Sequence, residues 1–452
     1  MKKSLRKWFV LLSSLLICGL LAACGTASNE KSPSVASNTT PHISAQPTPT
    51  ATPIVVGLGK DYAFVRNNQV WIALNGAALV QATHFTQVIT TTNVFWSQPL
   101  WFDNDHFLVF TLNVIDSGIG GAGCAYQIRY MRGHELFVLN TGTMQLTPLK
   151  APGEHSSAPG AINGSWSADS LFREDDTHLL AWDISGDYAS PSNASTNTGG
   201  LYRYDFTTQA LARVISAASV PGADEAPLMH PMRYSHEQLF YETTTSVDNN
   251  GTFDYAIYSH SLTNPTQPSV KILEVGRASF CPMNPTPGMS TFDEPGWDVS
   301  PDDTYLVAQT FMGNDLVHQS SQVQLIKLPD GTSTPIFQQV APQVFTQDVG
   351  LVWGPDSQSL LLSSGNPAST SNQEVFDTIN ITNPTALQSY TVSPSIGYGY
   401  MALWHASSTA FALMQNGPNR NDNGQVYLFK EGQPQGELLF ANADNFAWGA
   451  NQ

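Results

Sequence analysis

Seven polar residues stand at corresponding points along the chain, each just ahead of one copy of a short recurring pattern. They are Asn93, Asn163, His230, Glu294, Asp348, Tyr400 and Asp444. Three carboxylates, an imidazole and a phenol in one place could bind a cation or a sugar, or transfer protons as general acid and base. If they are dispersed, the same side chains are solvated polar groups. The chemistry therefore depends on whether the fold gathers them.

Cys124 and Cys281 are a second candidate pair. A disulfide between them is permitted outside the reducing cytosol, and it requires Cα atoms within roughly 7 Å of each other. Two separate free thiols are the alternative. The sequence leaves both possibilities open.

Several matches to catalytic motifs lack the context that their chemistry needs. Gly118–Gly123 fits G-x-G-x-x-G, but no helix follows it and no βαβ unit surrounds it, so we interpret it as a loop. His134-Glu135 and His236-Glu237 lack the second histidine of a zinc-protease helix. No G-x-S-x-G elbow occurs. We therefore predict no catalytic residue, no metal site and no cofactor.

The recurring pattern is an apolar or aromatic residue, usually Trp, followed by a small or polar residue and a turn. Its seven copies are centred on Trp96, Trp166, Tyr234, Val299, Trp353, Trp404 and Trp448, and Trp297 lies on the same strand face as Val299. Short alternating segments between the copies, broken by Gly, Pro, Asn and Asp, are typical of β-strands. A motif strand with three further strands per unit predicts an all-β fold, a seven-bladed β-propeller of four-stranded antiparallel blades.

The two ends of the repeat complement each other. Three predicted strands, 62–66, 70–74 and 79–83, precede the first copy without a motif strand of their own. The last copy, at Phe446–Gly449, is a motif strand with no partners after it. We therefore expect the C-terminal strand to complete the first blade and to close the ring.

Two copies, Trp353–Ser357 and Val299–Asp303, resemble the Trp-Ser-Pro-Asp-Gly motif of TolB-type propellers, which share their architecture with WD-repeat proteins. The resemblance is loose and covers residues 54–452. It implies a rigid interaction scaffold on the outer side of a membrane, and it does not imply an enzyme. For the motif tryptophans we predict a structural role, as packing between neighbouring blades.

In such a ring, two kinds of connection lie on the same face. One joins the second strand of a blade to its third, and the other joins the outer strand of a blade to the inner strand of the next. On that face lie the long connections 116–133, 185–199, 247–252, 313–320, 366–372 and 417–423, both cysteines and the seven polar residues. The opposite face has short turns, such as 141–143 and 330–332. Long loops usually carry binding, so we predict a binding face with the seven residues at its rim. Insertions tolerated without function are the alternative.

The first residues resemble a bacterial lipoprotein signal. A basic start precedes an apolar stretch, Trp8–Leu21, that is too short to span a bilayer comfortably. Ala22 and Ala23 then precede Cys24, as in a lipobox, and in that family this cysteine is acylated. The alternative is an ordinary secretory signal with an incidental cysteine. We predict a signal peptide over 1–23, a lipid-anchored Ser/Thr/Pro-rich linker over 24–53 and the propeller over 54–452.

The charge of the chain limits its partners. The net charge is −17, and four of the 19 cations but none of the 36 carboxylates precede Cys24. So acidic a surface repels nucleic acid and anionic lipid, which leaves the N-terminal lipid as the membrane contact. We expect an extracytoplasmic monomer, anchored to the bacterial cell membrane, that binds a protein or an envelope glycan without catalysis. The alternative is a glycan-binding or glycan-cleaving propeller that uses an acidic channel mouth.

Overall fold

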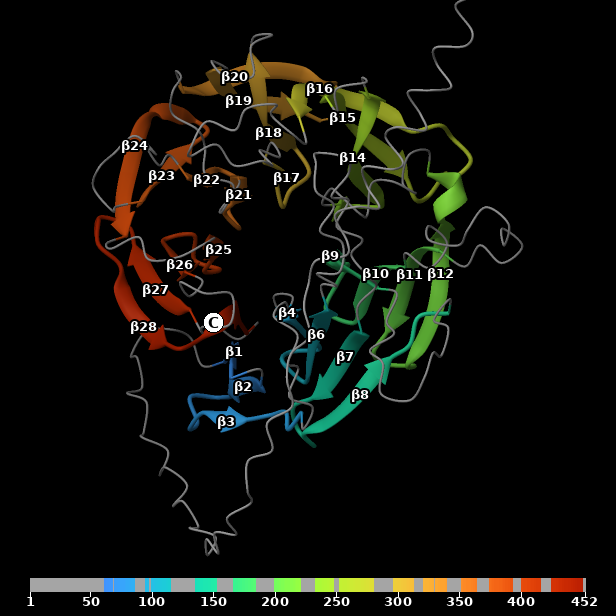
Figure 1. Cartoon of the computed structure of the whole chain (residues 1–452), viewed down its shortest axis with the longest axis vertical. Coiled ribbons are helices and arrows are strands. Elements are labelled where there is room, and N and C mark those ends of the chain that lie inside the picture. The colour runs from blue at the N-terminus through green and yellow to red at the C-terminus, as the bar shows by residue number, and fades with distance from the viewer. Residues whose placement is uncertain are drawn as a thin grey trace, which may run out of the picture. The chain divides into compact units, whose positions relative to one another are not determined.

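The structure, a computed structural model, shows seven antiparallel sheets that follow one another round a ring (Figure 1). It describes residues 61–67, 69–85, 94–96, 99–114, 135–152, 166–183, 199–220, 232–247, 252–279, 296–312, 320–328, 330–339, 351–363, 374–392, 400–415 and 424–449. Each sheet is one blade with four strand positions from the channel outward, which confirms the predicted seven-bladed propeller. The described part of the chain contains a single short helix, η2 (Ala217–Ser219), and none there is long and apolar enough to cross a membrane.

The strands of each blade are given from the inner to the outer position. Blade 1 contains β29 (Asp444–Trp448), β1 (Tyr62–Arg66), β2 (Gln69–Ala73) and β3 (Val80–Gln81). Blade 2 contains β4 (Val94–Trp96) and β5 (Leu100–Phe102), then β6 (Phe107–Val114), β7 (Glu135–Asn140) and β8 (Gln145–Leu149). Blade 3 contains β9 (Trp166–Arg173), β10 (His178–Asp183), β11 (Gly200–Asp205) and β12 (Ala210–Ser216). Blade 4 contains β13 (Met232–Ser235), β14 (Gln238–Val247), β15 (Thr252–Ser261) and β16 (Val270–Ser279).

The remaining three blades follow the same order. Blade 5 contains β17 (Trp297–Val299), β18 (Tyr305–Met312), β19 (Ser320–Lys327) and β20 (Thr332–Gln339). Blade 6 contains β21 (Leu351–Trp353), β22 (Ser359–Ser363), β23 (Glu374–Asn380) and β24 (Asn383–Val392). Blade 7 contains β25 (Tyr400–Trp404), β26 (Ala410–Gln415), β27 (Gln425–Lys430) and β28 (Glu437–Ala441).

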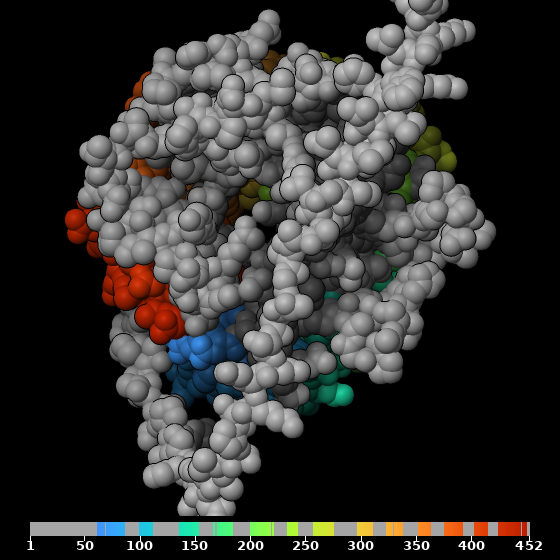
Figure 2. Space-filling view, viewed as in Figure 1, coloured from blue at the N-terminus to red at the C-terminus, as the bar shows by residue number. Residues whose placement is uncertain are grey.

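The ring closes within blade 1, as predicted. Strand β29 pairs antiparallel with β1, with Tyr62 opposite Trp448 and Ala63 opposite Ala447. The Arg66 guanidinium reinforces this closure, because its Nε donates to the carbonyl of Asn442, 376 residues away, at 3.0 Å. In space-filling form the first and last coloured segments lie side by side (Figure 2).

Alternating apolar side chains hold neighbouring blades together at interfaces that we call seams. In β10, Leu179 and Ala181 pack against blade 2, whereas Leu180 and Trp182 pack against blade 4. Every seam has its own buried apolar cluster, including the closing seam between blades 7 and 1, where Phe446 and Trp448 contact β26 and β27. A strand period of two thus places one blade face against each neighbour.

The motif tryptophans belong to these seams, as the repeat predicted. Four indole N–H groups donate to the preceding blade: Trp166 to the Leu149 carbonyl, Trp297 to the Glu242 carboxylate, Trp353 to the Asp298 carbonyl and Trp404 to the Val352 carbonyl, at 2.8–3.2 Å. Within the described residues the indole N–H groups of Trp101 and Trp448, on either side of blade 1, have no acceptor.

In two blades the turn does not follow the motif directly. The inner strand of blade 2 continues from β4 into β5, so its turn lies at Asp103–His106 and Trp101 occupies the seam. In blade 3, β9 runs on to Arg173. Trp166 pairs with Asp183 and Leu171 with Ala181, so the intervening residues form an irregular excursion within the strand. The pattern located the inner strands, but extra inner-strand residues in these blades displace the turns.

Candidate functional site

The structure describes the backbone of two of the seven predicted rim residues. Tyr400 is the first residue of β25, and Asp444 is the first residue of β29. They start the inner strands of blades 7 and 1, at the same end of the ring. Five rim residues and the cysteines lie outside the described residues: Asn93, Asn163, His230, Glu294, Asp348, Cys24, Cys124 and Cys281. Convergence of the rim and the Cys124–Cys281 bridge stay predictions.

The two ends of the blades carry connections of different length. First and second strands are joined by short turns: Ser235 pairs with Gln238, and Val299 with Leu306. We call this end the short-turn face. At the other end β6 stops at Val114 and β7 starts only at Glu135. Most second-to-third connections there are likewise long. The exceptions are blade 1, where Arg66 pairs with Gln69, and blade 4, where Val247 and Thr252 are close together in sequence. We call this end the long-connection face.

Hydrogen bonds between neighbouring inner hairpins tie the short-turn face together. The Asp103 backbone N–H donates to the Asp176 carbonyl at 2.7 Å, which links blades 2 and 3. His236 Nδ1 contacts the Asp303 carboxylate between blades 4 and 5. Motif serines continue the series, because Ser357 Oγ and Ser408 Oγ each accept a backbone N–H from the preceding blade, at 3.0 Å. The turn residues of this face are therefore largely used to hold the ring.

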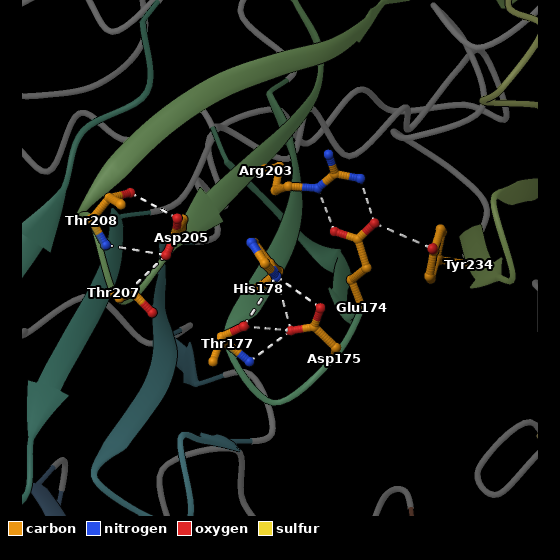
Figure 3. Close-up of polar contacts among 9 residues, drawn as sticks. All are labelled: Glu174, Asp175, Thr177, His178, Arg203, Asp205, Thr207, Thr208 and Tyr234. Atoms are coloured by element: carbon orange, nitrogen blue, oxygen red, sulfur yellow. Dashed lines mark hydrogen bonds and ion pairs between the residues drawn. The ribbon is translucent and has the colours of Figure 1, made fainter.

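A charged cluster links blades 3 and 4 on this face (Figure 3). The Glu174 carboxylate, 14% exposed, accepts two hydrogen bonds from the Arg203 guanidinium, with Nε at 2.5 Å from Oε2. The Tyr234 hydroxyl donates to the same carboxylate at 3.4 Å. The hydrogen bond to Glu174 raises the pKa of Arg203, and burial raises the pKa of Tyr234. Arg203 stays a cation and Tyr234 a neutral phenol, so the cluster acts as a clamp between blades.

An aspartate–histidine pair lies beside this clamp. Asp175 accepts from the Thr177 backbone at 2.7 Å and lies 2.8 Å from His178 Nδ1. Burial alone would raise the pKa of Asp175, but the hydrogen bonds from His178 and Thr177 outweigh it and hold the pKa below the ordinary value. The Thr177 hydroxyl lies at Nδ1 and at the same carboxylate, away from Nε2, so it is not placed as a nucleophile.

Asp205 caps the β11–β12 hairpin in the same manner. Its carboxylate accepts from the Thr207 and Thr208 backbones and from the Thr208 hydroxyl. The Thr208 hydrogen bonds, above all, lower the pKa of Asp205. Asx-turns of this kind satisfy hairpin backbone groups. Within the described residues, no group of three or more His, Cys, Asp or Glu side chains is placed to hold a metal ion.

A hollow of about 370 Å³ opens at the closing seam on the short-turn face. Its walls are His405, Ser407, Thr409, Ala410, Leu428, Lys430, Glu431 and Trp448. The His405 ring lies edge-on to Trp448, with centroids 5.2 Å apart and planes at 88°. Burial lowers the pKa of His405. The repeat did not reveal this site. Its one sequence signal is His405 itself, which directly follows the motif tryptophan where the other Trp-centred copies have Ser or Gly.

No protein-family model and no curated protein matches the chain. Among solved structures it is similar to the hydrazine synthase of Kuenenia stuttgartiensis, at 11% identity over 78% of this chain and 80% of that one, with a TM-score of 0.43. TolB from Acinetobacter baumannii gives 11% identity, 74% and 63% coverage and a TM-score of 0.36. Prolyl oligopeptidase B from Galerina marginata gives 9% identity over 82% of this chain and 47% of that one, with a TM-score of 0.47. The chain spans less than two thirds of the TolB structure and less than half of the peptidase. None of these likenesses bears on what the chain binds or catalyses.

Proposed function

We propose that the chain is an extracytoplasmic lipoprotein whose propeller is a non-catalytic scaffold that binds a protein or an envelope glycan on its long-connection face. The observation that carries this proposal is the difference between the two ends of the blades. Short turns and blade-to-blade hydrogen bonds occupy one end. Long connections, which carry recognition in rigid scaffolds, leave from the other.

Rigidity of the ring supports a binding role. Each seam is filled by buried apolar side chains, and four of the inner-strand tryptophans also hydrogen-bond across it. A scaffold of this kind holds its connections in fixed relative positions, which lowers the entropy lost on binding.

The N-terminal residues support the membrane tether. A basic start, an apolar stretch and Ala22-Ala23-Cys24 have the order of a lipoprotein signal. A chain of net charge −17 is repelled by anionic lipid, so a lipid on Cys24 would hold it at the membrane while the linker keeps the propeller away.

Site-specific cross-linking tests the binding face. A photoreactive side chain is placed at Ser190, between β10 and β11, and as a matched control at Asp330, in the β19–β20 turn of the short-turn face. In cells we expect a discrete cross-linked product from position 190 and none from position 330. Equal products from both positions, or none from any long connection, would contradict the proposal. The variants Glu294→Gln and Asp348→Asn test the glycan alternative. If oligosaccharides raise the melting temperature of the native chain but not of these variants, a glycan site at the rim is favoured.

Fatty-acid labelling tests the anchor. Cells supplied with a clickable palmitate analogue should label the chain, and Cys24→Ser should abolish the label. Cys18→Ser, within the apolar stretch, is the matched control and should leave it intact. Label retained in Cys24→Ser would overturn the lipoprotein assignment.

A further inference from the structure

We propose that the hollow in the closing seam is a binding site for a small zwitterion, an amino acid with a small apolar side chain, separate from the long-connection face. It lies between the β25–β26 and β27–β28 turns of blade 7 and Trp448 of blade 1. Its volume of about 370 Å³ is within the range of small-ligand pockets.

The closing seam differs from the two seams before it in the bond that Trp448 does not make. In the two preceding seams, the indole N–H donates to the carbonyl one residue ahead of the preceding blade's motif position. The same spacing would give Trp448 the carbonyl of Leu403. Instead the His405 ring lies edge-on against Trp448, and among the described residues the indole N–H, on a side chain 7% exposed, has no acceptor. A buried donor without an acceptor costs about 1–3 kcal/mol, so a ligand atom that accepted this hydrogen bond would recover part of that cost.

A chain of hydrogen bonds fixes the polar wall of the hollow. The Ser407 backbone N–H donates to His405 Nδ1 at 3.2 Å, so this nitrogen carries no proton. The Ser407 hydroxyl then donates to the same nitrogen at 2.8 Å. The Thr409 hydroxyl in turn donates to Ser407 Oγ at 2.8 Å, which leaves the Thr409 oxygen as an acceptor toward the hollow's contents. An ammonium group is the donor that suits this wall.

The charged wall of the hollow has one group of each sign. Glu431 and Lys430 line the hollow, and together they provide one carboxylate and one ammonium for a ligand with both charges. Lys430 Nζ lies 3.8 Å from Glu437 Oε2, and both side chains are well exposed. Such surface pairs contribute about 0–1 kcal/mol, so a ligand carboxylate can displace Glu437. An anion or a cation alone would pair with one of these two charged groups, whereas a zwitterion pairs with both.

The apolar wall sets the size of the ligand's side chain. Ala410 and Leu428 line the hollow next to Trp448. Leu428 and Trp448 are both buried in the closing seam. A methyl or isopropyl group against them would remove apolar surface from water, worth about 25 cal/mol per Å².

Calorimetric titration of the purified full chain with L-alanine, propionate and L-alanine methyl ester tests the proposal. We expect L-alanine to bind, and propionate, which lacks the ammonium, and the ester, which lacks the carboxylate, to bind at least tenfold more weakly. No heat from L-alanine at millimolar concentration would overturn the proposal. Propionate as tight as L-alanine would show a plain anion site and overturn it too.

Three variants locate the binding. Lys430→Met and Glu431→Gln should each weaken L-alanine binding at least tenfold, and Glu437→Gln should tighten it by releasing Lys430. Lys271→Met is the matched control, because it removes an equally exposed lysine paired with Glu274 on blade 4 and should leave binding unchanged. All four side chains are exposed enough for the ring to fold, which circular dichroism melting checks. Binding that survives both Lys430→Met and Glu431→Gln would place the amino acid elsewhere and refute the assignment.

Discussion

Replacing one tryptophan by phenylalanine should destabilise the ring less at the closing seam than at the seam before it. Trp404 and Trp448 occupy equivalent positions in neighbouring blades and are both largely buried, 8% and 7% exposed. Trp404 donates its indole N–H to the Val352 carbonyl at 3.2 Å. The indole N–H of Trp448 has no acceptor within the described residues. The pair therefore isolates the contribution of the hydrogen bond.

The expected difference follows from what each variant loses. Both variants lose the same ring atoms, so their packing losses are similar. Trp404→Phe also loses a buried hydrogen bond, a net loss of about 1 kcal/mol, and leaves the Val352 carbonyl short of a donor. Trp448→Phe removes a donor that is already without an acceptor, which offsets part of its packing loss. We expect Trp404→Phe to lower the free energy of unfolding by about 1–2 kcal/mol more than Trp448→Phe.

Equilibrium urea unfolding measures this difference. With a urea slope of about 3 kcal/mol/M, the two midpoints should differ by about 0.5 M, with the Trp404→Phe midpoint lower. The comparison requires equal slopes for both variants. A Trp448→Phe midpoint equal to or below that of Trp404→Phe would refute the reasoning, because the closing indole would then make a bond of its own.

Four further outcomes are expected. Deleting residues 444–452 removes β29 with its fully buried Phe446, so the melting temperature should fall sharply and the protein should aggregate; unchanged melting and solubility would disprove closure. Gly200→Ala should lower the free energy of unfolding by more than about 3 kcal/mol, because its Cβ would lie 2.1 Å from the Ile215 carbonyl oxygen at a φ of +143°. Gly331→Ala, at a φ of +70° with open space around it, should lower it by about 1 kcal/mol in the same urea assay. Burial lowers the pKa of both His260 and His405 below 6.5 in the folded state, so the unfolded chain binds more protons as the pH falls. The stabilisation present above pH 6.5 should therefore be lost as the pH falls through the folded pKa values. The plot of melting temperature against pH from 7.5 to 5 should be flatter in the double variant His260→Gln/His405→Gln, and an unchanged slope would contradict this. Arg203→Met should lower the urea midpoint by leaving the Glu174 carboxylate without its cation, and adding Glu174→Gln should restore part of it; failure of this rescue would show that the clamp contributes packing alone.

The blade count and the closure could be predicted from the sequence because they depend on repeated local features. Most seams are filled by a tryptophan of the motif strand, so residues such as Trp353 and Trp404 recur at intervals that four strands fill. Closure followed from strands without a motif at one end and a motif without strands at the other. The turn positions of blades 2 and 3 could not be predicted, because the excursion after Trp166 depends on pairing with β10.

The candidate sites show the same division. Placement of Tyr400 and Asp444 at the starts of inner strands follows from topology, which the repeat reveals. The hollow beside His405 follows from a contact between this histidine, which stands where the other Trp-centred copies have Ser or Gly, and a tryptophan in the next blade. No local pattern encodes that contact. The Glu174–Arg203 clamp likewise joins a displaced hairpin to a neighbouring strand, and its partners are adjacent only once blade 3 has formed.

The pairing of β1 with β29 also fixes the order in which the molecule can be assembled. Blades 2 to 7 are each continuous in the chain, so they can form in sequence as the ribosome releases them. Strand β1 must wait with an unpaired edge, and Phe64 with an uncovered ring, until residues some 376 positions later emerge. A nascent chain stalled just short of Asp444 would hold six finished blades beside one unpaired strand edge, so β29 decides whether that edge pairs within the chain or stays open to another chain.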